Sequence, residues 1–102
     1  MPEMMPTIES TAVISPEVLF QEIGGEAVLL DLASERYFGL DDVGTRIWQL
    51  LQDQGSLRVV YDRMLDEYDV EPTRLEEDLL KHVRELAEAG LVTIGEGDGS
   101  AR

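Results

Sequence analysis

The sequence contains no cysteine and a single histidine, His82, among its 102 residues. The lack of cysteine excludes a disulfide framework, a thiol nucleophile and any Cys-based zinc or iron-sulfur site. His82 follows Lys81, and no second histidine completes a common zinc-ligand set. We therefore expect His82 to be a surface or core-edge residue, and we expect the protein to use neither a metal nor another cofactor.

Basic residues are also scarce. Eight lysines and arginines stand against 22 acidic residues, which gives a formal net charge of -14. Such a field repels phosphate backbones and anionic lipids and attracts basic partners. The order of the predicted strands and helices also permits a DNA-binding winged-helix regulator. Its recognition helix, however, would offer DNA only Arg58 and Arg63 as basic residues, and these stand amid acidic residues. The charge favours a protein that binds no nucleic acid.

Long apolar runs and catalytic motifs are missing as well. No run approaches the ~20 residues that a membrane span requires, and residues 1–6 resemble no signal peptide. The sequence has neither a G-x-S-x-G elbow nor a Gly-rich phosphate-binding motif. We therefore expect a cytoplasmic protein that has no membrane association and is not an enzyme.

The residues that are present predict one small folded domain. Hydrophobic residues make up 43% of the chain and no internal repeat is visible. Residues 1–12 are predicted to be a flexible N-terminal arm, residues 13–94 the domain, and residues 95–102 a disordered tail. Within the arm and its junction, residues 12–14 have the composition to pair locally.

The order of patterns predicts an α+β fold of the winged helix-turn-helix type. Strands are expected over 18–23, 26–32 and 36–40, and they form a three-stranded antiparallel sheet. Three helices then follow, with apolar residues at helical spacing, and residues 91–94 form a short C-terminal strand or extended cover. Asp41 and Ser56 are predicted to be helix N-caps, Pro72 a first helical residue and Gly90 a C-terminal cap.

The central strand and the edge strand are expected to share a buried face. If Val28, Leu30 and Leu32 point to the helices, Phe38 and Leu40 join them, because side chains alternate with period two. The side chain of the intervening tyrosine, at position 37, then points to the opposite face.

The segment 36–40 is the predicted edge of the sheet, and its outer backbone groups are expected to be free. It consists of Arg36, Tyr37, Phe38, Gly39 and Leu40. Exposed edges are usually blunted by lysine, proline or a bulge. This edge is not, which leaves two occupants open: the chain's own N-terminal arm, or an extended peptide that adds as a strand.

Residues 18–94 resemble the PqqD-like proteins, which are the leader-peptide recognition domains of pathways that modify ribosomally made peptides. The match is carried by an ordered set of segments: Arg36–Asp41, Val43–Leu51, Glu67-Tyr68, the third helix with Asp78, Leu79 and Leu86, and Gly90–Val92. The resemblance implies a non-catalytic adaptor, or RiPP recognition element, that binds a precursor's leader segment by β-strand addition and presents it to a processing enzyme.

The same resemblance implies the binding site. The leader would pair with segment 36–40 and pack against the third helix, whose wall is assigned to Glu76, Leu79, Leu80 and Val83. Tyr37-Phe38 followed by Val43-Gly44 and Ile47-Trp48 is most similar to the stand-alone lasso-peptide branch. One departure is Asp41, where many relatives carry asparagine; either residue can cap a helix.

The lasso branch implies a leader with a Tyr-x-x-Pro pattern and a cysteine-protease (transglutaminase-like) partner that works with a cyclase. The alternative within the family is a PqqD-type chaperone for a radical-SAM enzyme in pyrroloquinoline quinone synthesis. A further alternative is a small structural subunit of a larger enzyme. We expect a monomer or a weak dimer.

Overall fold

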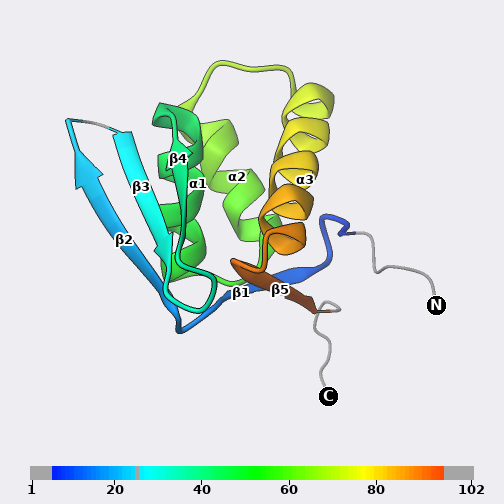
Figure 1. Cartoon of the computed structure of the whole chain (residues 1–102). Coiled ribbons are helices and arrows are strands. Elements are labelled where there is room, and N and C mark those ends of the chain that lie inside the picture. The colour runs from blue at the N-terminus through cyan, green and yellow to red at the C-terminus, as the bar shows by residue number, and fades with distance from the viewer. Residues whose placement is uncertain (1–5, 25, 96–102) are drawn as a thin grey trace.

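The computed structural model describes residues 6–24 and 26–95. Its elements run in the order β1 (Thr11–Ile14), β2 (Val18–Ile23), β3 (Glu26–Asp31), β4 (Arg36–Leu40), α1 (Asp42–Asp53), α2 (Leu57–Glu67), α3 (Pro72–Glu88) and β5 (Val92–Gly95). The predicted α+β fold is confirmed: an antiparallel sheet in the order β2-β3-β4 is followed by three helices and a short C-terminal strand (Figure 1). The predicted tail lies outside the described residues except for Gly95, which ends β5.

A second, two-stranded sheet joins the ends of the described chain. β1 pairs antiparallel with β5, and Ala12 lies opposite Ile94. The prediction of a flexible arm over residues 1–12 is therefore wrong for its last part, because Ala12 is buried and its N–H donates to the Gly55 carbonyl at 2.8 Å. The physical reason is that the backbone N–H and C=O groups of β5 need hydrogen-bond partners. The backbone of β1 supplies these partners, and its β-branched residues favour a strand. Residues 1–5 of the predicted arm lie outside the described residues.

The buried face of β3 differs from the prediction by one residue. Ala27, Leu29 and Asp31 are buried, whereas Val28 and Leu30 are only partly buried. The predicted third member, Leu32, is 47% exposed. A continuous apolar run does not reveal which alternate set faces inward, and a one-residue shift exchanges the two faces.

Asp31 can occupy the inner face because the following turn satisfies its carboxylate. Its two oxygens accept hydrogen bonds from the Ala33 N–H at 3.2 Å and the Ser34 hydroxyl at 2.8 Å. A buried polar group that is hydrogen-bonded escapes most of the desolvation cost. The last core-facing position of β3 is therefore occupied by a turn-forming residue.

The predicted orientation of β4 is confirmed. Phe38 lies opposite Leu29 and Leu40 opposite Ala27, so both share the inner face of the sheet. Tyr37 points to the other face and is 73% exposed.

The helix boundaries also follow the sequence signals. Asp41 accepts a hydrogen bond from the Gly44 N–H at 2.8 Å, and Ser56 accepts one from the Val59 N–H at 3.4 Å. Gly90, with φ of +82°, follows α3 in the left-handed conformation that glycine adopts at little cost. These caps set the positions at which α1, α2 and α3 begin or end.

The core lies between the inner face of the sheet and the three helices. Its fully buried large side chains come from every layer: Leu29, Trp48, Leu57, Val60, Met64, Leu79, Val83 and Leu91. Arg46 of α1 makes two hydrogen bonds to Glu67 at the end of α2, at 2.7 and 2.6 Å. This ion pair lowers the pKa of the Glu67 carboxyl and fixes the end of α2 against α1.

Candidate peptide-binding site

β4 forms one edge of the three-stranded sheet. Its only partner among residues 6–24 and 26–95 is β3, and the chain's own β1 pairs with β5 instead. The other edge of the sheet is β2. Of the two occupants that the sequence left open, the described part of the N-terminal arm does not cover β4.

The hydrogen-bond alternation identifies which groups of β4 point outward. The Leu32 N–H donates to the Glu17 carbonyl at 2.8 Å, on the β2 side of β3. In an antiparallel ladder successive residues bond to opposite sides, so Leu29 and Ala27 direct their backbone groups to β4. Their partners Phe38 and Leu40 therefore bond to β3, and the N–H and C=O groups of the intervening residues 37 and 39 face outward.

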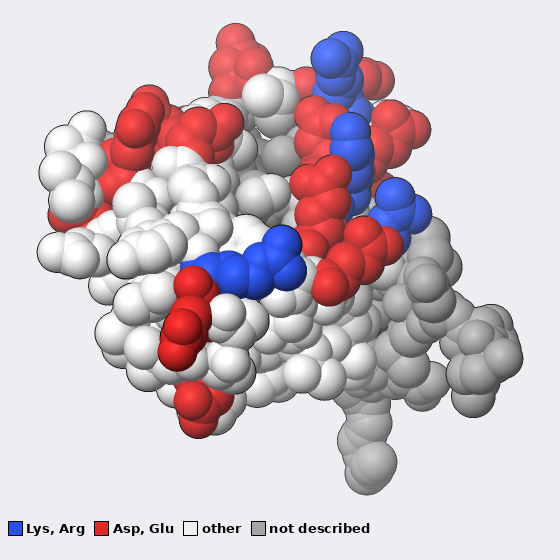
Figure 2. Space-filling model, in the orientation of Figure 1, with Lys and Arg blue, Asp and Glu red and all other residues white. Residues whose placement is uncertain are grey.

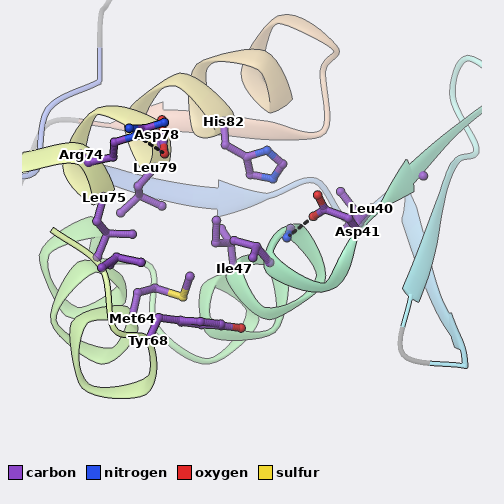
Figure 3. Close-up of a pocket in the computed structure, with 14 residues that line it drawn as sticks. Leu40, Asp41, Ile47, Met64, Tyr68, Arg74, Leu75, Asp78, Leu79 and His82 are labelled. Atoms are coloured by element: carbon purple, nitrogen blue, oxygen red, sulfur yellow. Dashed lines mark hydrogen bonds and ion pairs between the residues drawn. The ribbon is translucent and has the colours of Figure 1, made fainter. Parts of the chain in front are cut away.

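A pocket of about 400 Å³ opens beside this edge. It lies between the end of β4, the first turns of α1, the end of α2 and the first half of α3 (Figure 3). Its walls are mostly apolar and its charged residues come from α3 and the α1 cap, with these residues as the main lining: Gly39, Leu40, Asp41, Val43, Ile47, Met64, Tyr68, Arg74, Leu75, Asp78, Leu79 and His82. This volume lies within the range of ligand-binding pockets in proteins.

The α3 wall differs from the predicted set. Leu79 does line the pocket, but its neighbours there on the same flank of the helix are Arg74, Leu75, Asp78 and His82. Reading the sequence alone missed these four residues. The spacing was visible, but the sequence gives no indication of how α3 is rotated against α1.

The other predicted wall residues lie elsewhere. Val83 is fully buried in the core, and Leu80 lines a separate hollow with Pro6, Lys81 and others. Glu76 is partly buried and does not line the pocket. The structure thus brings together one of the four predicted α3 residues with the strand edge.

The predicted strand residues divide between the pocket, the edge and the outer face. Gly39 and Leu40 line the pocket. The Arg36 guanidinium carbon lies 5.9 Å from the centre of the Phe38 ring, on the same side of the strand. Tyr37 offers its backbone to the edge, while its side chain lies on the face away from the helices.

Two carboxylates of the pocket already have structural partners. Asp41 caps α1, as described above, and Asp78 lies 3.9 Å from the Arg74 Nε in an exposed ion pair. No serine, threonine or lysine is among the described residues that line the pocket. The described residues also contain no group of three or more His, Cys, Asp or Glu side chains placed to hold a metal ion.

His82 is the one polar pocket residue with an unsatisfied buried atom. Its Nε2 is buried and has no hydrogen-bond partner, and its imidazole packs close to Gly44 at the start of α1. Burial lowers the pKa of His82 below its ordinary value, against smaller opposing effects of Glu85 and Asp41. A neutral imidazole with a free nitrogen can exchange one hydrogen bond with a bound polar group.

The lowered pKa of His82 predicts a pH-dependent stability. The unfolded chain binds the proton on His82 more readily than the folded chain does. The free energy of unfolding is therefore highest above the ordinary pKa of histidine, and it decreases as the pH falls below about 6.5. Replacing His82 by Phe should therefore make the free energy of unfolding less dependent on pH between about 7 and about 5. Urea denaturation of both proteins at several pH values measures this dependence. An equal change of the unfolding free energy with pH in the two proteins would contradict the prediction.

The family follows from the comparison with protein-family models. The model for Coenzyme PQQ synthesis protein D (PqqD) matches residues 26–92, which include β3, β4, the three helices and the start of β5. The chain belongs to the PqqD family. This confirms the resemblance on which the site prediction was based. A search of curated proteins found no match.

Two solved structures, each a complex with a leader peptide, are similar to this PqqD-family chain. TbiB1 in complex with the TbiA(beta) leader peptide is 38% identical, covers 88% of this chain and 99% of its own, and has a TM-score of 0.76. Lasso peptide synthetase B1 complexed with the leader peptide is 32% identical, covers 81% of this chain and 98% of its own, and has a TM-score of 0.73. The predicted lasso-peptide type of recognition element is thereby confirmed.

Within the described residues, no helix is both long and apolar enough to cross a membrane.

Proposed function

We propose that this protein binds the leader segment of a precursor peptide as an additional strand on β4. The observation that carries the proposal is the unpaired edge at Tyr37 and Gly39 beside an apolar pocket. Backbone groups of a guest strand would bond to the edge, and its inward side chains would enter the pocket. The leader peptides in the two similar complexes support this assignment.

The pocket is suited to an aromatic side chain or a proline ring of the guest strand. Ile47, Met64 and Leu79 supply an apolar floor, and His82 supplies one hydrogen-bonding nitrogen. This chemistry suits the Tyr-x-x-Pro pattern that the lasso branch implies, because a tyrosine ring is apolar except for its hydroxyl. Titration with the synthetic leader of the neighbouring precursor gene tests the proposal, and a lack of binding would reject it.

The protein acts in this proposal as an adaptor without catalytic chemistry. Its pocket carboxylates cap a helix or pair with an arginine, and the lining provides no nucleophile with an adjacent base. The bound leader is presented to a transglutaminase-like cysteine protease, which works with a cyclase. Accelerated leader cleavage by the protease on addition of the adaptor is the expected result. Binding to a radical-SAM enzyme instead would favour the pyrroloquinoline quinone alternative.

A matched pair of substitutions distinguishes the pocket from the flank predicted by sequence. Val43 lines the pocket, is 44% exposed and lies in the first turn of α1, where an aspartate is compatible with the helix dipole. We expect Val43→Asp to weaken leader binding by about tenfold, because a charge would face an apolar contact. Leu80→Asp should change the affinity by less than about twofold, since Leu80 lies outside the pocket.

Fluorescence anisotropy with a labelled leader measures both affinities, and circular dichroism establishes that each variant is folded. If Leu80→Asp weakens binding and Val43→Asp does not, the leader lies along the other flank of α3. That result would restore the wall of Glu76 and Leu80.

A further inference from the structure

The face of the β2-β3-β4 sheet that points away from the helices carries an exposed apolar surface. The strand register places eight residues on this open face: Leu19, Gln21, Ile23, Glu26, Val28, Leu30, Tyr37 and Gly39. Leu19, Leu30 and Tyr37 form one cross-strand row. Contiguous apolar surfaces that no element of the same chain covers are typical of interaction sites.

The exposure of these side chains is high for apolar residues. Leu19 is 53% exposed, Ile23 66% and Tyr37 73%. Figure 2 shows a largely uncharged surface over β2 and β3, with acidic side chains at its upper and lower margins and a basic side chain beside it. The open face thus combines an apolar centre with mainly acidic charge at its margins.

The charge pattern selects among possible occupants. Glu26 is the only charged residue of the eight, and Glu17 and Glu35 are exposed near the ends of the strands. Two copies of a chain with a formal net charge of -14 would bring like charges together, as would an anionic lipid surface. A protein surface with an apolar centre and a rim of lysine and arginine is complementary.

The position of β4 links this face to the proposed leader site. Tyr37 is on the open face, and its backbone groups point to the edge where the guest strand would pair. A guest strand extends the sheet, so its alternate side chains would lie next to Tyr37 on the open face. A protein that docks there would contact the adaptor and the leader at once.

We propose that the open face of the sheet docks the leader-processing enzyme through an apolar surface rimmed by basic residues. This inference rests on the proposed adaptor function. It assigns the two faces different tasks, since the inner side and β4 edge hold the leader and the outer side holds the enzyme. The docked enzyme would meet the leader as the outermost strand of the sheet.

The test compares two equally charged substitutions at exposed apolar residues. Leu19→Lys changes the open face on β2, two strands away from the leader edge. Val13→Lys is the control, because Val13 is 63% exposed and lies on β1 in the other sheet. Binding to the purified pathway protease is measured by biolayer interferometry without leader, and leader affinity is measured separately by anisotropy.

We expect Leu19→Lys to weaken protease binding by at least about tenfold, since it removes an apolar contact and adds a repelling charge. Leader affinity should remain within about twofold, and Val13→Lys should change neither affinity. Leu19→Asp should weaken protease binding less than Leu19→Lys, because it preserves the acidic field. Wild-type protease binding should also weaken as salt rises from about 50 to about 300 mM.

Unchanged protease binding by Leu19→Lys would overturn the proposal, and so would an equal loss in Val13→Lys. Sedimentation showing a wild-type dimer that Leu19→Lys converts to a monomer would identify a second copy as the occupant and also overturn it. Failure of the wild type to bind leader would instead reject the proposed function, because that affinity is measured without protease.

Discussion

Replacing Gly39 by proline is expected to weaken leader binding by at least about tenfold. Proline removes the outward N–H of Gly39 and places its ring at the edge where the guest strand would pair. The β3-β4 ladder should survive, since Gly39 does not bond to β3 in the alternation described above. Isothermal titration calorimetry with the leader peptide measures the loss.

Gly39→Ala is the matched control for this substitution. A Cβ atom at Gly39 would meet no atom within 4 Å, so alanine fits and retains the N–H. We expect Gly39→Ala to change the affinity by less than about threefold. Equal affinities for the proline and alanine variants would show that the leader does not pair with β4.

Replacing Trp48 by alanine is expected to destabilise the fold by about 3 to 5 kcal/mol. Trp48 is 1% exposed and is the largest of the fully buried side chains, so its removal leaves a cavity in the centre of the core. Domains of this size are stable by about 5 to 15 kcal/mol, and the loss would be a large part of that margin. Urea denaturation followed by circular dichroism measures the change.

Two further variants control for the tryptophan result. Tyr37→Ala should change the free energy of unfolding by less than about 0.5 kcal/mol, because Tyr37 is largely exposed. Trp48→Phe should lower the free energy of unfolding less than Trp48→Ala does, because an aromatic ring still fills most of the space. It also removes the buried indole Nε1, which has no hydrogen-bond partner. Equal losses in Trp48→Phe and Trp48→Ala would contradict a cavity as the main cause.

Local signals predicted the elements of the fold well. Asp41, Ser56, Pro72 and Gly90 mark helix ends through bonds and backbone angles that depend on a few neighbouring residues. The edge position of β4 followed from the absence of another strand pattern before residue 91. These features were predictable because each is decided within a short stretch of chain.

Features that depend on packing were not predictable in the same way. Asp31 faces inward and Leu32 does not. Hydrophobicity alone predicts the opposite, because the turn whose groups bond to the Asp31 carboxylate lies outside the strand. The rotation of α3, which brings His82 and Leu75 to the pocket, depends on contacts with α1 and α2. The pairing of β1 with β5 joins segments about 80 residues apart, and no local pattern announces such a partner.

The pairing of Thr11 with Gly95 brings a strand near the N-terminal end of the described chain to the same place as its last residue. That place belongs to the β1-β5 ribbon, whereas the leader edge and the open face belong to the other sheet (Figure 1). Adjacent entry and exit points permit insertion of a domain into a host loop or a circular permutation. The fold is therefore suited to insertion as a cassette into another protein through the β1-β5 ribbon, away from the β4 edge.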